Sequence, residues 1–281
     1  MSVRIEDKIA DVDGIAVHYR DAGAGLRRAE AASAAQAGEE TIVFLHGAGG
    51  APPRGASFVS MLAENHRVLL PSRPGFDDTP LGPCKSFRDV AAVMAAFIRR
   101  IAGGKVHVVA QSAGSTVGLW LAVEHPDLVA SLTLSAPAAF AQRPLPGHAP
   151  PSPELLARRL YGDTPGWSAP PSEEEHARTR KNAAAYQQHF RGEDGNPELL
   201  ARLKDIKAPT LVVVAGADQI VPPEAMAPYQ KNIHVCYRMF VYGAAHELPI
   251  SAAPRWVNLV TDFVDRGEAF VVNIGTQVSA A

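Results

Sequence analysis

The hydrophobic positions of this chain gather into short runs that polar segments separate. Six runs, the last more polar than the others, cover residues 41–45, 67–70, 106–109, 132–135, 211–215 and 234–241. Several are continuously apolar, which is typical of parallel strands that helices cover on both faces. The pattern therefore predicts six strands of a mostly parallel sheet.

The N-terminal region has a different pattern. Residues 3–9 and 15–19 are two short strand candidates, and the Asp13-Gly14 pair between them favours the positive φ angles of a tight turn. These residues predict a hairpin. Residues 24–40 are rich in Ala, Gly, Glu and Gln and nearly free of large apolar side chains, so we expect an exposed loop there.

Helical patterns alternate with the strands, at residues 86–101, 115–124 and 256–263. This alternation predicts an α/β fold, a mostly parallel twisted sheet flanked by helices. It breaks between residues 136 and 205, where prolines cluster around two helical patterns at residues 154–161 and 173–190. We therefore expect residues 1–135 and 206–281 to form one core domain, and residues 136–205 to be an insertion above the carboxyl edge of the sheet.

The composition of the chain argues against binding to nucleic acid or to a membrane. The chain has 281 residues, 47% of them hydrophobic and 20% charged, with a net charge of −2, which gives no electrostatic case for binding nucleic acid or an anionic membrane. It contains no apolar run of the ~20 residues that cross a bilayer, and its charged N-terminus does not resemble a signal peptide. We therefore expect a cytoplasmic protein.

Metal and cofactor motifs are also missing from the sequence. Cys84 and Cys236 lie far apart without a C-x-x-C partner, and the ten histidines form no metal-binding motif. We expect no metal, no cofactor, and two cysteines that serve as buried small side chains.

The segment around Ser112 is the strongest candidate for chemistry. An apolar strand runs into this serine, helix-forming sequence follows, and the residues two before and two after it, Ala110 and Gly114, are small. A nucleophile on a sharp strand-to-helix turn needs small residues at these positions because strand and helix pass closely there. Alanine replaces the commoner glycine at the first of them. Taken alone, the pattern also fits a serine that caps a helix.

Three further loops follow predicted strands. A glycine-rich turn comes after residues 41–45 and begins with His46 and Gly47. Asp218 follows residues 211–215, and His246 lies on a loop of small residues after the last strand. The chain order serine, aspartate, histidine, each just past a strand, is specific.

With these motifs, and the Arg73-Pro74-Gly75-Phe76 loop, the chain resembles the α/β-hydrolase superfamily over nearly its whole length, specifically a serine-nucleophile, capped, esterase-like branch. The resemblance implies that residues 136–205 form a helical cap. It also implies a triad of Ser112, Asp218 and His246, with the backbone N–H groups of Ala48 and Ala113 as the oxyanion hole. A serine at this turn disfavours the branches that use aspartate, the dehalogenases and epoxide hydrolases.

Other residues receive weaker assignments. We expect His46 to bridge loops, Asp77 and Asp78 to form a turn, and Glu247 to be a solvated neighbour of His246 with a small effect on its pKa. Candidates for the substrate pocket are Gly47, Phe140, Tyr161, Trp167, Tyr186 and Phe190, although aromatic residues at helical spacing more often pack than bind a ligand.

The leading functional hypothesis is a serine hydrolase that cleaves a small-to-medium carboxylic ester through an acyl-enzyme on Ser112. The same triad also fits a C–C bond hydrolase, a lactonase, a perhydrolase or an acyltransferase. A non-catalytic small-molecule-binding protein is the alternative from another class. We expect a small molecule as the partner, and either a monomer or a homodimer.

Overall fold

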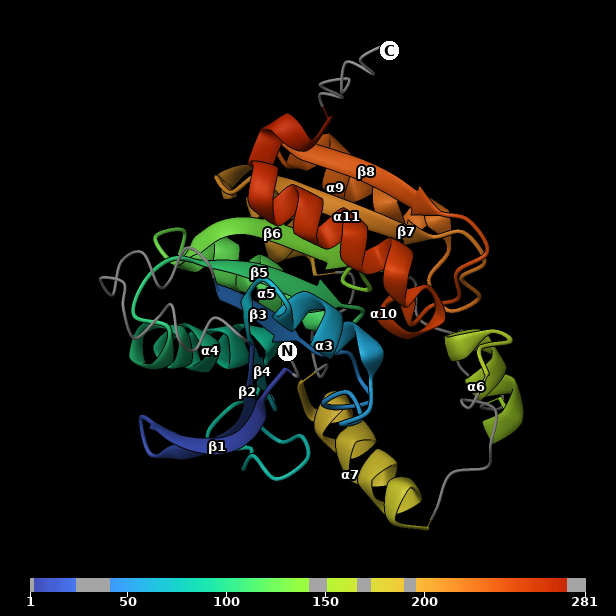
Figure 1. Cartoon of the computed structure of the whole chain (residues 1–281). Helices are drawn as coiled ribbons and strands as arrows, with labels where there is room; N and C mark the ends of the chain where they lie inside the picture. The colour runs from blue at the N-terminus through green and yellow to red at the C-terminus, as the bar shows by residue number, and fades with distance from the viewer. Residues whose placement is uncertain (1–2, 24–40, 142–150, 166–172, 190–195, 272–281) are drawn as a thin grey trace, which may run out of the picture.

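The computed structural model describes residues 3–23, 41–141, 151–165, 173–189 and 196–271. The predicted loop at residues 24–40 lies outside them. An eight-stranded sheet forms the centre of the molecule, in the order β1-β2-β4-β3-β5-β6-β7-β8 (Figure 1). In the parts of the chain that the structure describes, no helix is both long and apolar enough to cross a membrane.

The predicted N-terminal hairpin is present. Strands β1 (Ile5–Val12) and β2 (Ile15–Ala22) pair antiparallel, and Asp13 and Gly14 turn between them with φ angles of 50° and 84°. Both strands extend further along the chain than predicted. β2 continues to Ala22 because its last residues pair antiparallel with β4, an interaction that local sequence does not reveal.

The six other strands are those that the apolar runs predict. These six pair with one another in parallel, and their bounds are β3 (Thr41–Leu45), β4 (Arg67–Pro71), β5 (Val106–Gln111), β6 (Val129–Ser135), β7 (Thr210–Ala215) and β8 (Cys236–Val241). β6 begins three residues earlier than expected, and β8 two residues later. The prediction of an α/β fold is confirmed.

Helices cover both faces of this sheet (Figure 1). One face packs on α4 (Phe87–Ile101), α5 (Gly114–Glu124) and α9 (Ala227–Asn232), which share a hydrophobic cluster with the sheet. The other face packs on α3 (Ser57–Ala63), α10 (Leu248–Ser251) and α11 (Ala253–Arg266). The parallel strands are therefore buried on both sides, as their continuous apolar runs require.

The segment between β6 and β7 carries further helices. α6 (Pro153–Tyr161) and α7 (Glu173–His189) lie on the side toward which the arrowheads of β6 and β7 point (Figure 1). α8 (Pro197–Arg202) and the short 3₁₀ helix η1 (Leu203–Asp205) instead pack against α5. Two more 3₁₀ helices, η2 (Pro223–Met226) and η3 (Gly267–Val271), precede α9 and follow α11.

Candidate active site

Ser112 occupies the turn between β5 and α5. Its φ angle is +51°, a conformation that L-residues rarely adopt, and its N–H donates to the carbonyl oxygen of Ser135 over 2.9 Å. The N-cap residue of α5 is Ala113, and the Ser112 hydroxyl contacts a histidine rather than the helix. The alternative that Ser112 only caps a helix is therefore wrong. Strain at a fixed position is typical of a functional residue.

The small residues around Ser112 have separate physical reasons. A Cβ at Gly114 would lie 2.3 Å from the carbonyl oxygen of Leu45, so only glycine fits between β3 and α5. Ala110 is fully buried, and a Cβ at Gly118 would lie 3.2 Å from the methyl carbon of Ala110. The strand therefore accepts alanine because the helix places a glycine opposite it. This compensating glycine lies eight residues beyond Ala110, outside the five-residue motif.

Ser112, His246 and Asp218 form one chain of hydrogen bonds. The distance from His246 Nε2 to Ser112 Oγ is 2.8 Å, and that from His246 Nδ1 to Asp218 Oδ2 is also 2.8 Å. The side chains of His246 and Asp218 are each 2% exposed, so little water competes for these bonds. A carboxylate only accepts, which places the imidazole proton on Nδ1 and leaves Nε2 free to take the serine proton.

Other groups hold the two partners of the serine in place. The second oxygen of Asp218, Oδ1, accepts the N–H groups of Ile220 and Val221 over 2.7 and 2.9 Å. The amide of Gln111 donates to the carbonyl oxygen of His246 over 2.8 Å. Gln111 is a site residue that the sequence motifs did not predict, although its position directly before the serine and at the end of a strand was a signal.

The glycine-rich turn after β3 lies against the serine. A Cβ on Gly47 would stand 3.3 Å from the Cβ of Ser112, so this backbone approaches the nucleophile closely. Gly47 is one of the predicted pocket residues, and the structure places it beside Ser112. The structure records no acceptor for the N–H groups of Ala48 and Ala113 among the residues it describes. Such unpaired donors are what an oxyanion hole needs.

His46 bridges two loops, as predicted. The N–H of Arg73 donates to His46 Nε2 over 3.0 Å, and His46 Nδ1 lies 2.8 Å from the carbonyl oxygen of Gly47. Since Nε2 accepts, Nδ1 carries the proton and donates to Gly47. Burial and the nearby Arg73 charge lower the pKa of His46 to about 3. A neutral imidazole therefore holds the carbonyl of Gly47 in place.

The turn at Asp77 binds more distant residues than expected. Asp77 has a φ angle of +50°, but its carboxylate accepts from the Ala51 N–H, the Ser72 hydroxyl and the Asn182 amide rather than from its own turn. Asn182, fully buried on α7, also accepts the N–H of Asp77 over 2.9 Å and donates to the carbonyl oxygen of Gly49 over 2.9 Å. This set of contacts, the Asn182 clasp, joins α7 to the glycine-rich turn.

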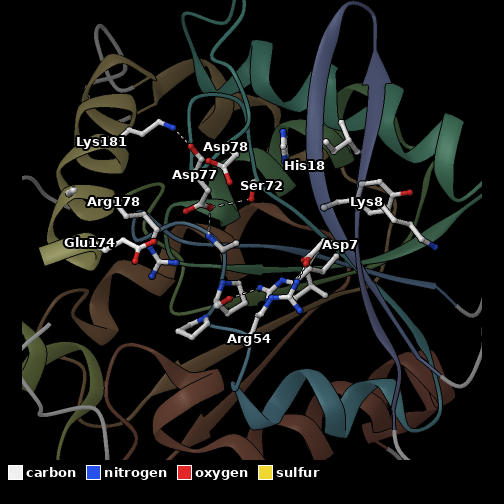
Figure 2. A pocket seen from close by; sticks show the side chains of 18 residues that line it. Asp7, Lys8, His18, Arg54, Ser72, Asp77, Asp78, Glu174, Arg178 and Lys181 are labelled. Atoms are coloured by element: carbon white, nitrogen blue, oxygen red, sulfur yellow. Dashed lines mark hydrogen bonds and ion pairs between the residues drawn. The ribbon is translucent and has the colours of Figure 1, made fainter. Parts of the chain in front are cut away.

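A separate hollow with a volume of about 1150 Å³ lies beside Asp77. Figure 2 shows the side chains that line it. Ser72 and Asp77 line it, but Ser112, Asp218 and His246 do not. Its charged side chains are largely paired: Arg54 forms an ion pair with Asp7, and Lys181 donates to the backbone oxygen of Asp77 (Figure 2). We therefore do not place the reaction there.

Glu247 is half-buried beside the glycine-rich turn rather than fully solvated, contrary to the prediction. Its Oε1 would be 3.6 Å from a Cβ on Gly47, and its N–H donates to the carbonyl oxygen of Leu160 on α6 over 2.8 Å. Burial raises the pKa of its carboxyl, opposed by His246 and reinforced by Asp218.

The predicted pocket aromatics have different outcomes. Phe140 packs against Tyr229, with ring centroids 5.1 Å apart, in the cluster beneath the sheet. This contact favours packing for Phe140, and its place in a pocket stays a prediction. Tyr161 is half-buried at the end of α6. Trp167, Phe190 and the side chain of Tyr186 lie outside the described residues.

Comparisons with known proteins agree with this architecture. The model of the alpha/beta hydrolase family matches residues 42–258. A 2-hydroxy-6-oxononadienedioate/2-hydroxy-6-oxononatrienedioate hydrolase of Burkholderia vietnamiensis is 27% identical over 241 residues, which cover 76% of this chain and 78% of that protein. The acetyltransferase component of the acetoin cleaving system of Cupriavidus necator is 31% identical over 134 residues, but these cover only 47% of this chain and 32% of that protein.

A solved structure extends the likeness to the whole fold. The crystal structure of a serine hydrolase involved in carbazole degradation superposes with a TM-score of 0.71 at 20% identity, over 93% of this chain and 99% of that one. At this identity the likeness concerns the fold alone. Because the family match spans well over half of the sequence, the chain belongs to the alpha/beta hydrolase family and is a hydrolase.

Proposed function

We propose that this hydrolase cleaves carboxylic esters through an acyl-enzyme on Ser112. The observation that carries the proposal is the pair of 2.8 Å contacts from His246, one to Ser112 Oγ and one to Asp218 Oδ2. Free serine is a weak nucleophile near neutral pH, and a base within hydrogen-bond reach activates it. The bonded chain supplies that base together with the carboxylate that orients it.

In this reaction, His246 accepts the Ser112 proton and passes it to the leaving group. His246 Nε2 takes the Ser112 proton while Oγ attacks the ester carbonyl carbon, and Asp218 stabilises the imidazolium that forms. The imidazolium then gives its proton to the leaving alkoxide, and an alcohol departs. Water attacks the acyl-enzyme with His246 again as the base, which releases the carboxylic acid and restores Ser112.

The backbone at two turns supplies the remaining stabilisation. We assign the N–H groups of Ala48 and Ala113 to the oxygen of the tetrahedral intermediate, and one such donor contributes roughly 3 to 4 kcal/mol to the transition state. We also assign residues 136–205 a cap role, supported by α6 and α7 beside the carboxyl ends of the strands. A roofed pocket favours a small-to-medium substrate.

Two measurements test the ester function. Intact mass spectrometry should show one phosphonyl adduct on Ser112 after exposure to a fluorophosphonate, and p-nitrophenyl acyl esters of two to eight carbons should be turned over. Ser112→Ala should lose the adduct and at least about 10³-fold of the turnover. Ser115→Ala is the matched control. It removes a neighbouring hydroxyl, which donates to the carbonyl oxygen of Ala110, and leaves Ser112 and Gly114 unaltered. Full turnover by Ser112→Ala would contradict the proposal.

The C–C bond hydrolase is the second candidate, and the names of the relatives favour it. The Burkholderia vietnamiensis relative and a Comamonas testosteroni relative, 25% identical over 242 residues, are both named as hydrolases of 6-oxo dienoic acids. The same attack by Ser112 at a ketone carbonyl would release a carbon leaving group that His246 protonates. Parallel assays with a 2-hydroxy-6-oxo-dienoate and a simple ester, at equal enzyme concentration, separate the candidates. A kcat/KM higher for the dienoate would replace the ester assignment.

A further inference from the structure

Glu247 and the nucleophile both lie against Gly47 of the glycine-rich turn. A Cβ on Gly47 would lie 3.3 Å from the Cβ of Ser112 and 3.6 Å from Glu247 Oε1. Because both distances start from one point, Ser112 Cβ and Glu247 Oε1 are at most about 7 Å apart. An acyl group bonded to Ser112 therefore forms in the same site as this carboxyl.

The carboxyl of Glu247 has no hydrogen-bond donor among the described residues. Its backbone is fixed at both ends, by the N–H donated to Leu160 and by the carbonyl oxygen that accepts the N–H of Ser251 over 2.8 Å. Glu247 is half-buried and its carboxyl oxygens are not among the buried unsatisfied atoms of the described residues, so they stay open to the site. A group that the fold holds beside the nucleophile without a protein partner is available to a substrate.

The charges around Glu247 define what it accepts. His246 and Asp218 are the charged neighbours that influence its pKa, which burial raises above the usual range. Asp218 is already paired with His246, so neither offers Glu247 a permanent cation. Above that raised pKa, Glu247 is ionised, and a substrate carboxylate near the scissile carbonyl would place a second negative charge beside an uncompensated one.

We propose that Glu247 is a specificity-determining residue that excludes substrates with a carboxylate close to the scissile carbonyl and admits neutral acyl groups. This inference rests on the proposed nucleophilic role of Ser112 and names the substrate class of that site. It also predicts a difference from the relatives named for dienoate and dienedioate substrates, because those compounds carry carboxylates.

The size of the effect follows from Coulomb's law. Two carboxylates about 6 Å apart, at an effective dielectric constant of about 20, repel enough to lower a rate about a hundredfold. A longer acyl chain, or screening by salt, reduces this to about tenfold. We therefore expect a tenfold to hundredfold discrimination between otherwise matched neutral and anionic compounds.

The test uses two alkyl fluorophosphonates that differ only at the end of a short chain, where one has a carboxamide and the other a carboxylate. Second-order labelling rates at Ser112, followed by intact mass at pH 8.5, should favour the carboxamide about tenfold or more in the natural protein. Glu247→Gln should reduce this ratio to below about threefold. Glu64→Gln removes the same charge from an exposed position at the end of α3 and should leave the ratio unchanged.

Equal labelling rates in the natural protein would overturn the inference without any variant. A ratio that Glu247→Gln leaves intact, or that Glu64→Gln reduces as much, would also overturn it. Ethyl fumaramate and monoethyl fumarate repeat the comparison with true esters, since the trans double bond keeps the carboxylate from attacking its own ester. If neither ester is cleaved while Ser112 still labels, the ester function fails and the labelling ratio still decides the role of Glu247.

Discussion

Acid should destabilise the protein through His46, because the folded state holds this residue in its neutral form. His46 is 2% exposed, and its Nε2 must stay unprotonated to accept the N–H of Arg73. A proton on Nε2 breaks that bond and places a cation beside the Arg73 guanidinium. Acid therefore destabilises the turn that contains Gly47 and Ala48.

The magnitude follows from the difference between the two pKa values. Burial and Arg73 lower the pKa of His46 from 6.5 to about 3 in the folded protein, so between these values the unfolded chain binds more protons. The stabilisation is fully present above pH 6.5 and is lost as the pH falls toward 3. At 1.36 kcal/mol per pH unit, the loss from this one group reaches about 2 kcal/mol at pH 5.

Urea unfolding at pH 7.5 and 5.0 measures this loss. The His46→Gln variant keeps an acceptor for Arg73 but does not titrate, so it should be less stable at pH 7.5 and lose about 2 kcal/mol less than the natural protein on acidification. His234→Gln, at an exposed position, is the control and should behave as the natural protein does. Equal acid losses in the natural protein and His46→Gln would refute the reasoning.

Three further predictions concern the serine and its surroundings. Asp218→Asn should keep the fold, because an amide oxygen still accepts from the loop N–H groups, which circular dichroism checks. It should lower kcat for an ester about 10³- to 10⁴-fold, because the amide favours the tautomer of His246 that carries its proton on Nε2 and cannot accept the Ser112 proton. Ala110→Gly should cost about 1 kcal/mol in urea unfolding, since it removes a buried methyl, and leave turnover within about threefold. Asn182→Ala should remove the Asn182 clasp, so hydrogen exchange of the α7 amides should accelerate while that of β5 stays slow; unchanged exchange in α7 would contradict the role of the clasp.

The parts of the fold that the sequence predicts are those with a local physical cause. The β-branched run before Gln111 must be a buried strand, and the elbow needs Gly114 because a Cβ there would meet a backbone oxygen at 2.3 Å. Helix α3 was missed although its buried residues Phe58, Val59, Leu62 and Ala63 follow helical spacing. With only seven residues, it gave too short a pattern to separate from a loop.

The contacts that the sequence does not predict join residues far apart along the chain. Asn182 and Asp77 are 105 residues apart, and each has an ordinary local role, in a helix and in a turn. Only the fold brings the Asn182 amide to the carbonyl oxygen of Gly49. The solvated position expected for Glu247 was wrong for the same reason, since its burial depends on α6 and on the Gly47 turn.

The residues that the sequence predicts carry out the bond cleavage, and the residues that only the fold brings together bear on the choice of substrate. Ser112, Asp218 and His246 follow strand ends, so chain order alone indicates them, and their chemistry fits an ester and a ketone equally. The choice between those bonds falls to groups that contact the acyl and leaving portions of the substrate. Glu247 is such a group, because it lies within about 7 Å of Ser112 Cβ with no partner among the described residues. A carboxylate there opposes anionic dienoates and leaves neutral esters unaffected, so under this proposal the substrate class depends on an acidic residue whose place the sequence did not reveal.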